Sequence, residues 1–146
     1  MEDIYPMPMF AQLQVTDLER SAHWYTEAAG FHTIFASRDP DGKLQMLHIR
    51  RARYQDLMLV PSRQQDVPLA GAGVALYFQF WEDWDALESF AEQARVASDS
   101  AVEGPIDTPW NAREVRLRDP DGYRLIFSKG PVKEMSMSDL FPQSQE

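Results

Sequence analysis

Histidines and carboxylates are the residues of this chain that could support catalysis or bind a metal ion. The sequence has three histidines, His23, His32 and His48, and no cysteine, so a thiolate zinc site and a cysteine nucleophile are excluded. His23 lies one position off the apolar stripe of a predicted helix, and His32 follows the end of that helix, so we expect both at the surface. His48 lies in a predicted strand, where a neutral imidazole could act as a hydrogen-bond partner or a base. Alternatively, it only bonds a strand neighbour.

No established catalytic motif accompanies these histidines. The sequence contains no G-x-S-x-G, no phosphate-binding glycine loop and no spacing that supports a Ser-His-Asp triad. Glu82, Asp83, Asp85 and Glu88 cluster at the start of a predicted helix, where negative charge stabilises the helix dipole. We therefore predict no catalytic residue.

Two strands near the end of the chain are best suited to position polar side chains. Arg113–Arg118 and Tyr123–Ser128 alternate in polarity around the turn sequence Asp119-Pro120-Asp121-Gly122. Because side chains alternate along a strand, one face of this hairpin carries Val115, Leu117, Leu125 and Phe127. The other face carries Glu114, Arg116, Arg124 and Ile126. The first face is predicted to be buried and the second to be open to a ligand.

The first half of the chain predicts a strand, a helix and three strands. The strands are Met7–Val15, Phe31–Ser37, Leu44–Arg50 and Asp56–Val60. The helix starts at the possible capping box Thr16-x-x-Glu19 and stops at Gly30. Residues 61–72 are rich in Pro, Gln, Gly and Ala and form the best internal boundary.

The second half repeats this order. It predicts a strand at Val74–Phe80, a helix capped by Asp85, one more strand within Ser98–Pro105, and the hairpin. We therefore expect one domain over residues 1–146, with module 1 at about 7–61, module 2 at about 73–130 and a tail at 131–146. Leu140 and Phe141 in the tail could dock on a partner.

Composition excludes several classes of protein. The 146 residues are 44% apolar and 25% charged, as in an ordinary globular domain. No apolar run approaches the roughly 18 residues of a membrane helix, and no secretion signal is visible, so we expect no membrane association and a cytoplasmic location. A net charge of −9 argues against nucleic-acid binding. Residues 73–146 hold 7 Lys and Arg against 14 Asp and Glu, which could favour a cationic ligand or simply reflect a solvated helix face.

Two stretches of the sequence resemble one known family. QVTDLERSAHWYTEAAGF and TPWNAREVRLRDPDGYRLIFSK are similar to the glyoxalase/bleomycin-resistance/extradiol-dioxygenase family, which has the vicinal oxygen chelate fold. The matching positions are Val15, Asp17, Ser21, Trp24, Tyr25, Gly30, Phe31 and residues 119–127. The resemblance covers roughly residues 7–130, and it implies an α+β fold in which two βαβββ modules form a cup-shaped mixed sheet with helices on the outside.

The resemblance also implies where a metal would sit. Metal-dependent members place His, Gln and Glu ligands at cup-facing strand positions, which correspond here to Phe10, Met58, Ala75 and Ile126. None of these side chains is a good ligand for a divalent ion. We therefore expect no metal and no cofactor.

A metal-free cup with aromatic walls predicts a binding protein. The residues expected to contact the ligand are Phe10, Gln12, His48, Met58, Tyr77, Gln79, Trp110, Glu114, Arg116 and Arg124. They suit a small apolar or aromatic, or a cationic, molecule. The resemblance implies antibiotic sequestration of the bleomycin-resistance type by a homodimer. The alternatives are a lyase, isomerase or dioxygenase with an unorthodox metal site or a metal-free reaction, and an interaction module whose cup is vestigial.

Overall fold

The computed structural model describes residues 5–62, 73–98, 101–134 and 137–140. Most of the predicted boundary at 61–72 and the side chains of Leu140 and Phe141, which were predicted to dock, lie outside what it describes. None of the described helices is both long enough and apolar enough to cross a membrane.

Module 1 has the predicted order of strand, helix and three strands. Its elements are β1 (Ala11–Val15), α1 (Leu18–Glu27), β2 (His32–Arg38), β3 (Leu44–Arg50) and β4 (Asp56–Pro61). They form a four-stranded sheet in the order β1-β4-β3-β2, in which only the β1–β4 pair is parallel.

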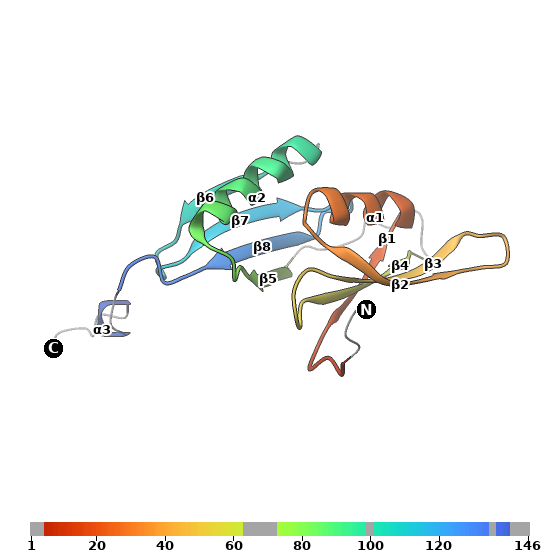
Figure 1. Ribbon diagram of the computed structural model, residues 1–146, viewed down its shortest axis with the longest axis horizontal. Helices are drawn as coiled ribbons and strands as arrows, with labels where there is room; N and C mark the ends of the chain where they lie inside the picture. The colour runs from red at the N-terminus through yellow and green to blue at the C-terminus, as the bar shows by residue number, and fades with distance from the viewer. Residues whose placement is uncertain (1–4, 63–72, 99–100, 135–136, 141–146) are drawn as a thin grey trace.

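Module 2 repeats this topology. Its elements are β5 (Ala75–Gln79), α2 (Trp84–Ala97), β6 (Glu103–Asp107), β7 (Arg113–Arg118) and β8 (Arg124–Lys129), and a short helix α3 (Met137–Leu140) follows. The sheet order is β5-β8-β7-β6, with β5 and β8 parallel. The predicted α+β class and the two βαβββ modules are confirmed. Helices α1 and α2 lie on the same side of the two sheets (Figure 1).

Several predicted boundaries of the elements differ from the structure, and three of the differences have a clear physical reason. Strand β1 begins at Ala11 and not at Met7, because Pro6 and Pro8 have no N–H to donate to a sheet. The cap of α1 is Asp17 and not Thr16, since the Asp17 carboxylate accepts from the backbone N–H of Arg20. The cap of α2 is Asp83 and not Asp85, because the extended backbone of Asp83 lets its carboxylate accept from Ala86 N–H at 2.8 Å.

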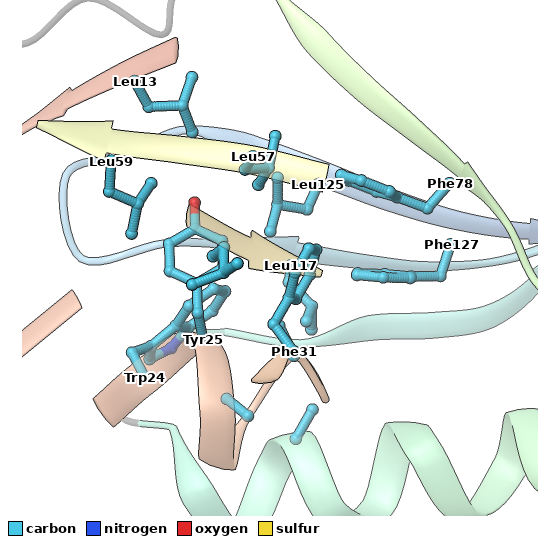
Figure 2. Close-up of a cluster of buried hydrophobic side chains, with 14 of the residues drawn as sticks. Leu13, Trp24, Tyr25, Phe31, Leu57, Leu59, Phe78, Leu117, Leu125 and Phe127 are labelled. Atoms are coloured by element: carbon cyan, nitrogen blue, oxygen red, sulfur yellow. The ribbon is translucent and has the colours of Figure 1, made fainter. Parts of the chain in front are cut away.

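One hydrophobic core joins the two modules (Figure 2). The rings of Tyr25 and Phe31 from module 1 meet edge to face, and Phe31 meets Phe78 of module 2 in the same way, with centroids 5.6 Å apart. Phe78 then stacks on Phe127 at 5.2 Å. Such pairs contribute about 0.5–1.5 kcal/mol each beyond their buried area, so the aromatic series helps to fix one module against the other.

Polar contacts also tie α1 to the turn between β7 and β8. The hydroxyl of Tyr25 donates to Asp119 Oδ2 at 2.7 Å, and both residues are buried. Burial raises the pKa of Asp119 despite the hydrogen bonds that it accepts, and burial next to this carboxylate raises the pKa of Tyr25 well above its ordinary value. The hydroxyl of Thr16 donates to Asp121 in the same turn.

Candidate functional site

Each sheet has a helix-free face, which is the face opposite α1 in module 1 and opposite α2 in module 2. Strand alternation assigns Gln12, Met58 and His48 to this face in module 1, and the register places them in one row across β1, β4 and β3. In module 2 the register places Gln79 beside Ser128 and Glu114. The parity predicted for these strands is therefore correct.

His48 is bound to a carboxylate that the sequence analysis did not select. Its Nε2 lies 2.6 Å from Asp56 Oδ2, and the Asp56 side chain is fully buried while 29% of the His48 side chain is exposed. Arg50 binds the same carboxylate through two hydrogen bonds of 2.8 and 3.0 Å. Burial alone would raise the pKa of Asp56, but the hydrogen bonds from Arg50 and His48 outweigh it and lower that pKa. The ionised carboxylate therefore accepts a hydrogen bond from the Nε2–H of His48. In a neutral His48, Nδ1 is then left as a hydrogen-bond acceptor.

Two exposed aromatic side chains lie close to this network. The ring of Phe10 lies nearly parallel to the His48 ring, with centroids 6.4 Å apart, and it is 48% exposed. Phe10 also lines a groove of about 300 Å³ together with Tyr77, which is 57% exposed, and with Tyr54 and Gln55. Phe10 of module 1 and Tyr77 of module 2, both predicted ligand contacts, therefore line the same groove within one chain.

Glu114 is the centre of the polar network in module 2, and it is not available to a ligand. Its side chain is fully buried, although this face was predicted to be open; Ile126 of the same face is buried as well. The carboxylate accepts hydrogen bonds from Trp110 Nε1 at 3.2 Å, from Arg116 Nη2 at 3.1 Å and from Ser128 Oγ at 3.4 Å. Glu114 therefore positions other side chains, and those side chains are the ones that face solvent.

Trp110 is the most prominent of them. It lies in the loop between β6 and β7, is 51% exposed, and is held at its indole N–H by Glu114. Together with Gln79 and Ser128 it lines a second hollow of about 300 Å³. A tethered indole ring with an exposed face is a pre-organised surface for stacking a flat ligand.

The predicted contact residues are divided between the two modules, and Phe10 and Tyr77 line a common groove. Phe10, Gln12, His48 and Met58 lie on module 1, while Tyr77, Gln79, Trp110, Glu114, Arg116 and Arg124 lie on module 2. Sequence reasoning missed Arg50 and Asp56, although both share the parity of His48 and Met58. It also missed Tyr54 and Gln55, because they lie in the turn between β3 and β4, where strand alternation makes no prediction.

The residues present do not fit a divalent metal ion. The four positions that correspond to metal ligands in the family carry Phe10, Met58, Ala75 and Ile126, which offer at most a thioether. The two buried carboxylates of these faces, Asp56 and Glu114, are each bound to an arginine. Over the described ranges, no group of three or more histidine, aspartate or glutamate side chains is close enough to hold a metal ion.

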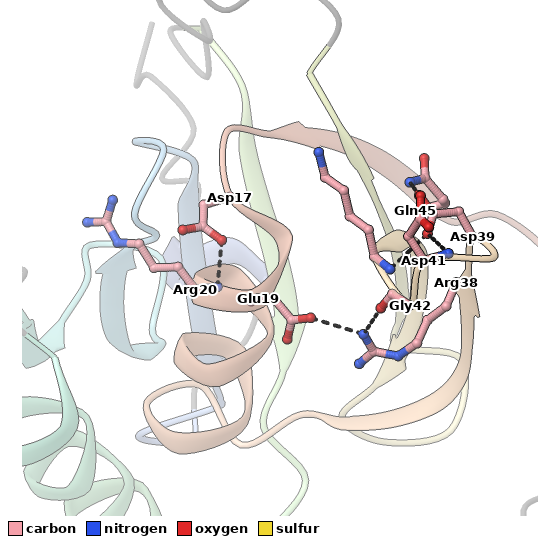
Figure 3. Close-up of polar contacts among 9 residues, drawn as sticks. Asp17, Glu19, Arg20, Arg38, Asp39, Asp41, Gly42 and Gln45 are labelled. Atoms are coloured by element: carbon pink, nitrogen blue, oxygen red, sulfur yellow. Dashed lines mark hydrogen bonds and ion pairs between the residues drawn. The ribbon is translucent and has the colours of Figure 1, made fainter.

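A larger hollow of about 510 Å³ lies elsewhere, at the start of α1. It is lined by Thr16, Asp17, Glu19, Lys43 and Ser62, among others, and contains none of the predicted contact residues. The surrounding polar groups are occupied with local structure: Asp17 caps α1 and Glu19 pairs with Arg38 (Figure 3). We therefore place the candidate site on the helix-free faces.

Comparisons with known proteins agree with this fold. The sequence pattern of the Glyoxalase/Bleomycin resistance protein/Dioxygenase superfamily matches residues 8–127. No curated protein matches the sequence. Among solved structures, TioX from Micromonospora sp. ML1 is 20% identical, with 87% of this chain and 98% of that chain covered and a TM-score of 0.62.

Two further structures describe the range of functions found on this fold. TnmS3, an antibiotic binding protein from Streptomyces sp. CB03234, is 20% identical over 88% of this chain and 98% of its own, with a TM-score of 0.62. The fosfomycin resistance protein FosX from Listeria monocytogenes, solved with Mn(II) and sulfate, is 12% identical over 87% and 94%, with a TM-score of 0.63. At these identities the likeness establishes the fold alone.

Proposed function

Because the chain belongs to the Glyoxalase/Bleomycin resistance protein/Dioxygenase superfamily, we propose that it binds a small, largely flat and apolar molecule without a metal ion, as a drug-sequestering protein does. The ligand contacts on module 1 are Phe10, Gln12, His48 and Met58. Those on module 2 are Tyr77, Gln79, Trp110, Arg116 and Arg124, with Glu114 as their support. An antibiotic binding protein among the structures of the same fold is consistent with this proposal.

One observation carries the proposal. Phe10, Tyr77 and Trp110 are each about half exposed and lie at the helix-free faces. Within the described part of the chain, the only buried carboxylates of these faces are Asp56 and Glu114, and each is paired with an arginine. Large aromatic side chains are normally buried, and a group of exposed ones indicates a binding surface. Burying about 200 Å² of ligand surface here would contribute about 5 kcal/mol before the cost of association.

A homodimer would complete such a site. The helix-free faces of both modules lie away from α1 and α2 (Figure 1), so a second copy could cover module 1 of one chain with module 2 of the other. Light scattering on the purified protein tests this arrangement. A monomer at the concentration where ligand binds would refute it, without affecting the proposal that the faces bind ligand.

Tryptophan fluorescence titration tests the binding function. A panel of planar aromatic molecules and cationic glycopeptide antibiotics should include at least one compound that changes the emission of Trp110 in a saturable way. Trp110→Ala should weaken that binding about tenfold or more, since a stacked aromatic contact is lost. Isothermal titration calorimetry measures the affinity of this variant, because the variant lacks the fluorescent reporter. Trp81→Ala is the matched control, because Trp81 is 69% exposed but lies beyond the end of β5. Drug binding would be refuted if no compound of the panel changed the emission and if expression of the protein did not protect cells from these antibiotics.

A second function is favoured by one specific contact. The short hydrogen bond between His48 and the buried carboxylate of Asp56 orients an imidazole whose Nδ1 could accept a proton, which is the arrangement of a general base. A metal-free enzyme of this fold would then lose turnover in His48→Gln but keep ligand affinity. Metal analysis after dialysis separates both proposals from a lyase, isomerase or dioxygenase with an unorthodox metal site, which would retain one equivalent of metal.

A further inference from the structure

We infer that the helix-free face of module 2 contains an anion subsite, in which Arg116, Arg118 and Arg124 bind an acidic oxygen group of the ligand, such as a carboxylate, phosphate or sulfonate. The inference rests on the proposed binding function of this face and adds the chemical class of one group of the ligand. Arg116 and Arg124 were predicted as ligand contacts, whereas Arg118 was not.

Arg118 and Arg124 lie directly opposite each other on β7 and β8. Both are exposed, and they share the helix-free face because the neighbouring pair, Leu117 and Leu125, is buried on the other side. Like charges at directly opposite positions of two strands destabilise the pair. Within the described residues, no carboxylate lies within 4.0 Å of either guanidinium. An anion between them would remove the repulsion.

An internal comparison shows that this arrangement is not a general property of the turn. The sequence Arg-Asp-Pro-Asp-Gly occurs twice, starting at Arg38 and at Arg118. In both copies the first aspartate accepts from two backbone N–H groups of its own turn. Arg38, however, pairs with Glu19 at 3.1 Å and donates to Gly42 O at 2.7 Å (Figure 3). Arg118 reaches only the carbonyl of Gly122, at 3.5 Å. In the first turn the arginine is therefore part of an ion pair, whereas in the second turn the guanidinium of Arg118 has no carboxylate within 4.0 Å among the described residues.

Arg116 supplies a third, fixed guanidinium beside this pair. Its Nη2 donates to the fully buried Glu114, which fixes its position. Its Nε is buried and finds no hydrogen-bond partner in the described structure. The remaining acidic neighbour is Glu103, whose carboxylate is 3.9 Å away and whose side chain is 64% exposed. Three arginines therefore face two carboxylates, one of which is loosely held.

The space between these side chains has the size of an acidic group and not of a whole ligand. Arg116, Arg118 and Arg124 line a hollow of about 90 Å³ together with Ile126 and Glu103. At about 30 Å³ per water, this volume holds roughly three water molecules. Arginine suits such a hollow because its planar fork binds carboxylate and phosphate oxygens in pairs.

The position of the hollow suggests how one ligand could use both kinds of contact. Ile126 lies in register with Arg116 on one side and with the exposed Tyr77 on the other. An aromatic ring against the exposed Tyr77 would therefore direct an acidic substituent toward the three arginines. The prediction of a cationic ligand came from the excess of Asp and Glu over Lys and Arg in residues 73–146, but the local charge decides which group binds here.

A matched pair of fluorescent probes tests this inference on the intact protein. Anilinonaphthalene sulfonate and phenylnaphthylamine share their aromatic rings and differ in the sulfonate group. At low ionic strength the wild-type protein should bind the sulfonate about tenfold more tightly, and added salt should reduce that preference. The double variant Arg118→Gln/Arg124→Gln should lose the preference and bind the two probes with equal affinity. Arg20→Gln, an exposed arginine on α1, is the control and should bind both probes as wild type does.

The outcomes separate this inference from the proposed function. Equal binding of the two probes by wild type, or a preference that persists in the double variant, would overturn the anion subsite and leave aromatic binding intact. If neither probe binds, the proposed aromatic site fails, and a titration with inorganic phosphate followed by the NMR signals of arginine side chains decides the subsite. Saturable phosphate binding that is lost in the double variant would support it, and its absence in wild type would overturn it.

Discussion

Replacing Tyr25 by phenylalanine should destabilise the protein because, among the described residues, it removes the only donor to one oxygen of a buried carboxylate. Asp119 Oδ1 accepts from the backbone N–H groups of Asp121 and Tyr123, at 2.9 and 2.8 Å, whereas Oδ2 accepts from the Tyr25 hydroxyl at 2.7 Å. The Asp119 side chain is buried, so water cannot easily replace the lost hydroxyl. A buried polar atom left without a partner costs about 1–3 kcal/mol. Taking about 2 kcal/mol, a chain of this size should lose about 4–8 °C in melting temperature.

The loss should also depend on pH in a defined direction. Burial raises the pKa of Asp119 above its ordinary value of 3.8, and the hydrogen bond from Tyr25 opposes that rise. A raised pKa in the folded state means that stability decreases as pH rises through it, because the folded state disfavours the ionised form. Tyr25→Phe removes an interaction that favours the ionised form, so the variant should lose more stability at about pH 7 than at about pH 4.

Urea denaturation followed by far-ultraviolet circular dichroism measures both effects. Tyr123→Phe is the matched control, because its hydroxyl also joins the modules, by donating to Gln14 O at 3.0 Å, but does so at the exposed surface. Water can replace that bond, so its removal should cost about 0.5 kcal/mol or less. Equal costs for the two variants, or a Tyr25→Phe cost that shrinks as pH rises, would refute the reasoning.

Three further predictions test other features of the fold. Asp83→Ala should lower the free energy of unfolding by about 1 kcal/mol through loss of the α2 cap, and Asp85→Ala by about 0.5 kcal/mol or less, as measured by urea denaturation. A larger loss in Asp85→Ala than in Asp83→Ala would indicate that Asp85 is the cap, as the sequence predicted. Asp56→Asn should cost about 3 kcal/mol at neutral pH by breaking a buried ion pair. Because the Asp56 pKa is lowered in the folded state, this difference from wild type should shrink as pH falls below 3.8, and a pH-independent difference in denaturation midpoints would contradict it. Gly104→Ala should cost at least about 2 kcal/mol, because its φ is +102° and a Cβ would lie 2.3 Å from the carbonyl oxygen of Glu114. Gly122→Ala, with φ +92° and open space around it, should melt at a clearly higher temperature than Gly104→Ala.

Local features of the sequence were sufficient to predict the order of strands and helices, whereas the fold that they form was implied by the resemblance to a known family. Strand β3 and strand β7 were predicted with their observed ends, because alternation of apolar and polar residues depends only on neighbours along the chain. Gly30 and Gly42 adopt the positive φ that a helix stop and a tight turn require. The caps were displaced by one or two residues because two residues that can cap lie close together at each helix start, Thr16 and Asp17 at α1 and Asp83 and Asp85 at α2. Backbone geometry selects between them.

The candidate site was predictable only in part. Parity correctly assigned Gln12, His48 and Met58 to one face, but it could not indicate that the Asp56 carboxylate would accept a hydrogen bond from the imidazole. Nor could parity indicate that Glu114 would be buried, because alternation distinguishes the two faces of a strand and not the depth of a side chain within its face. That depth is set by Trp110, Arg116 and Ser128, which close over the carboxylate.

The sequence by itself therefore determined the two modules, their strands and turns, and which side chains share a face. The tertiary structure alone decided which distant residues meet. Tyr25 and Asp119, 94 positions apart, bond because a common core holds α1 against the turn between β7 and β8. The two Arg-Asp-Pro-Asp-Gly turns are identical in sequence, yet within the part of the chain that the structure describes only the first has a carboxylate within reach of its arginine. The physical reason is that local structure follows from backbone preferences and periodicity, whereas the partner of a charged side chain depends on the elements packed around it.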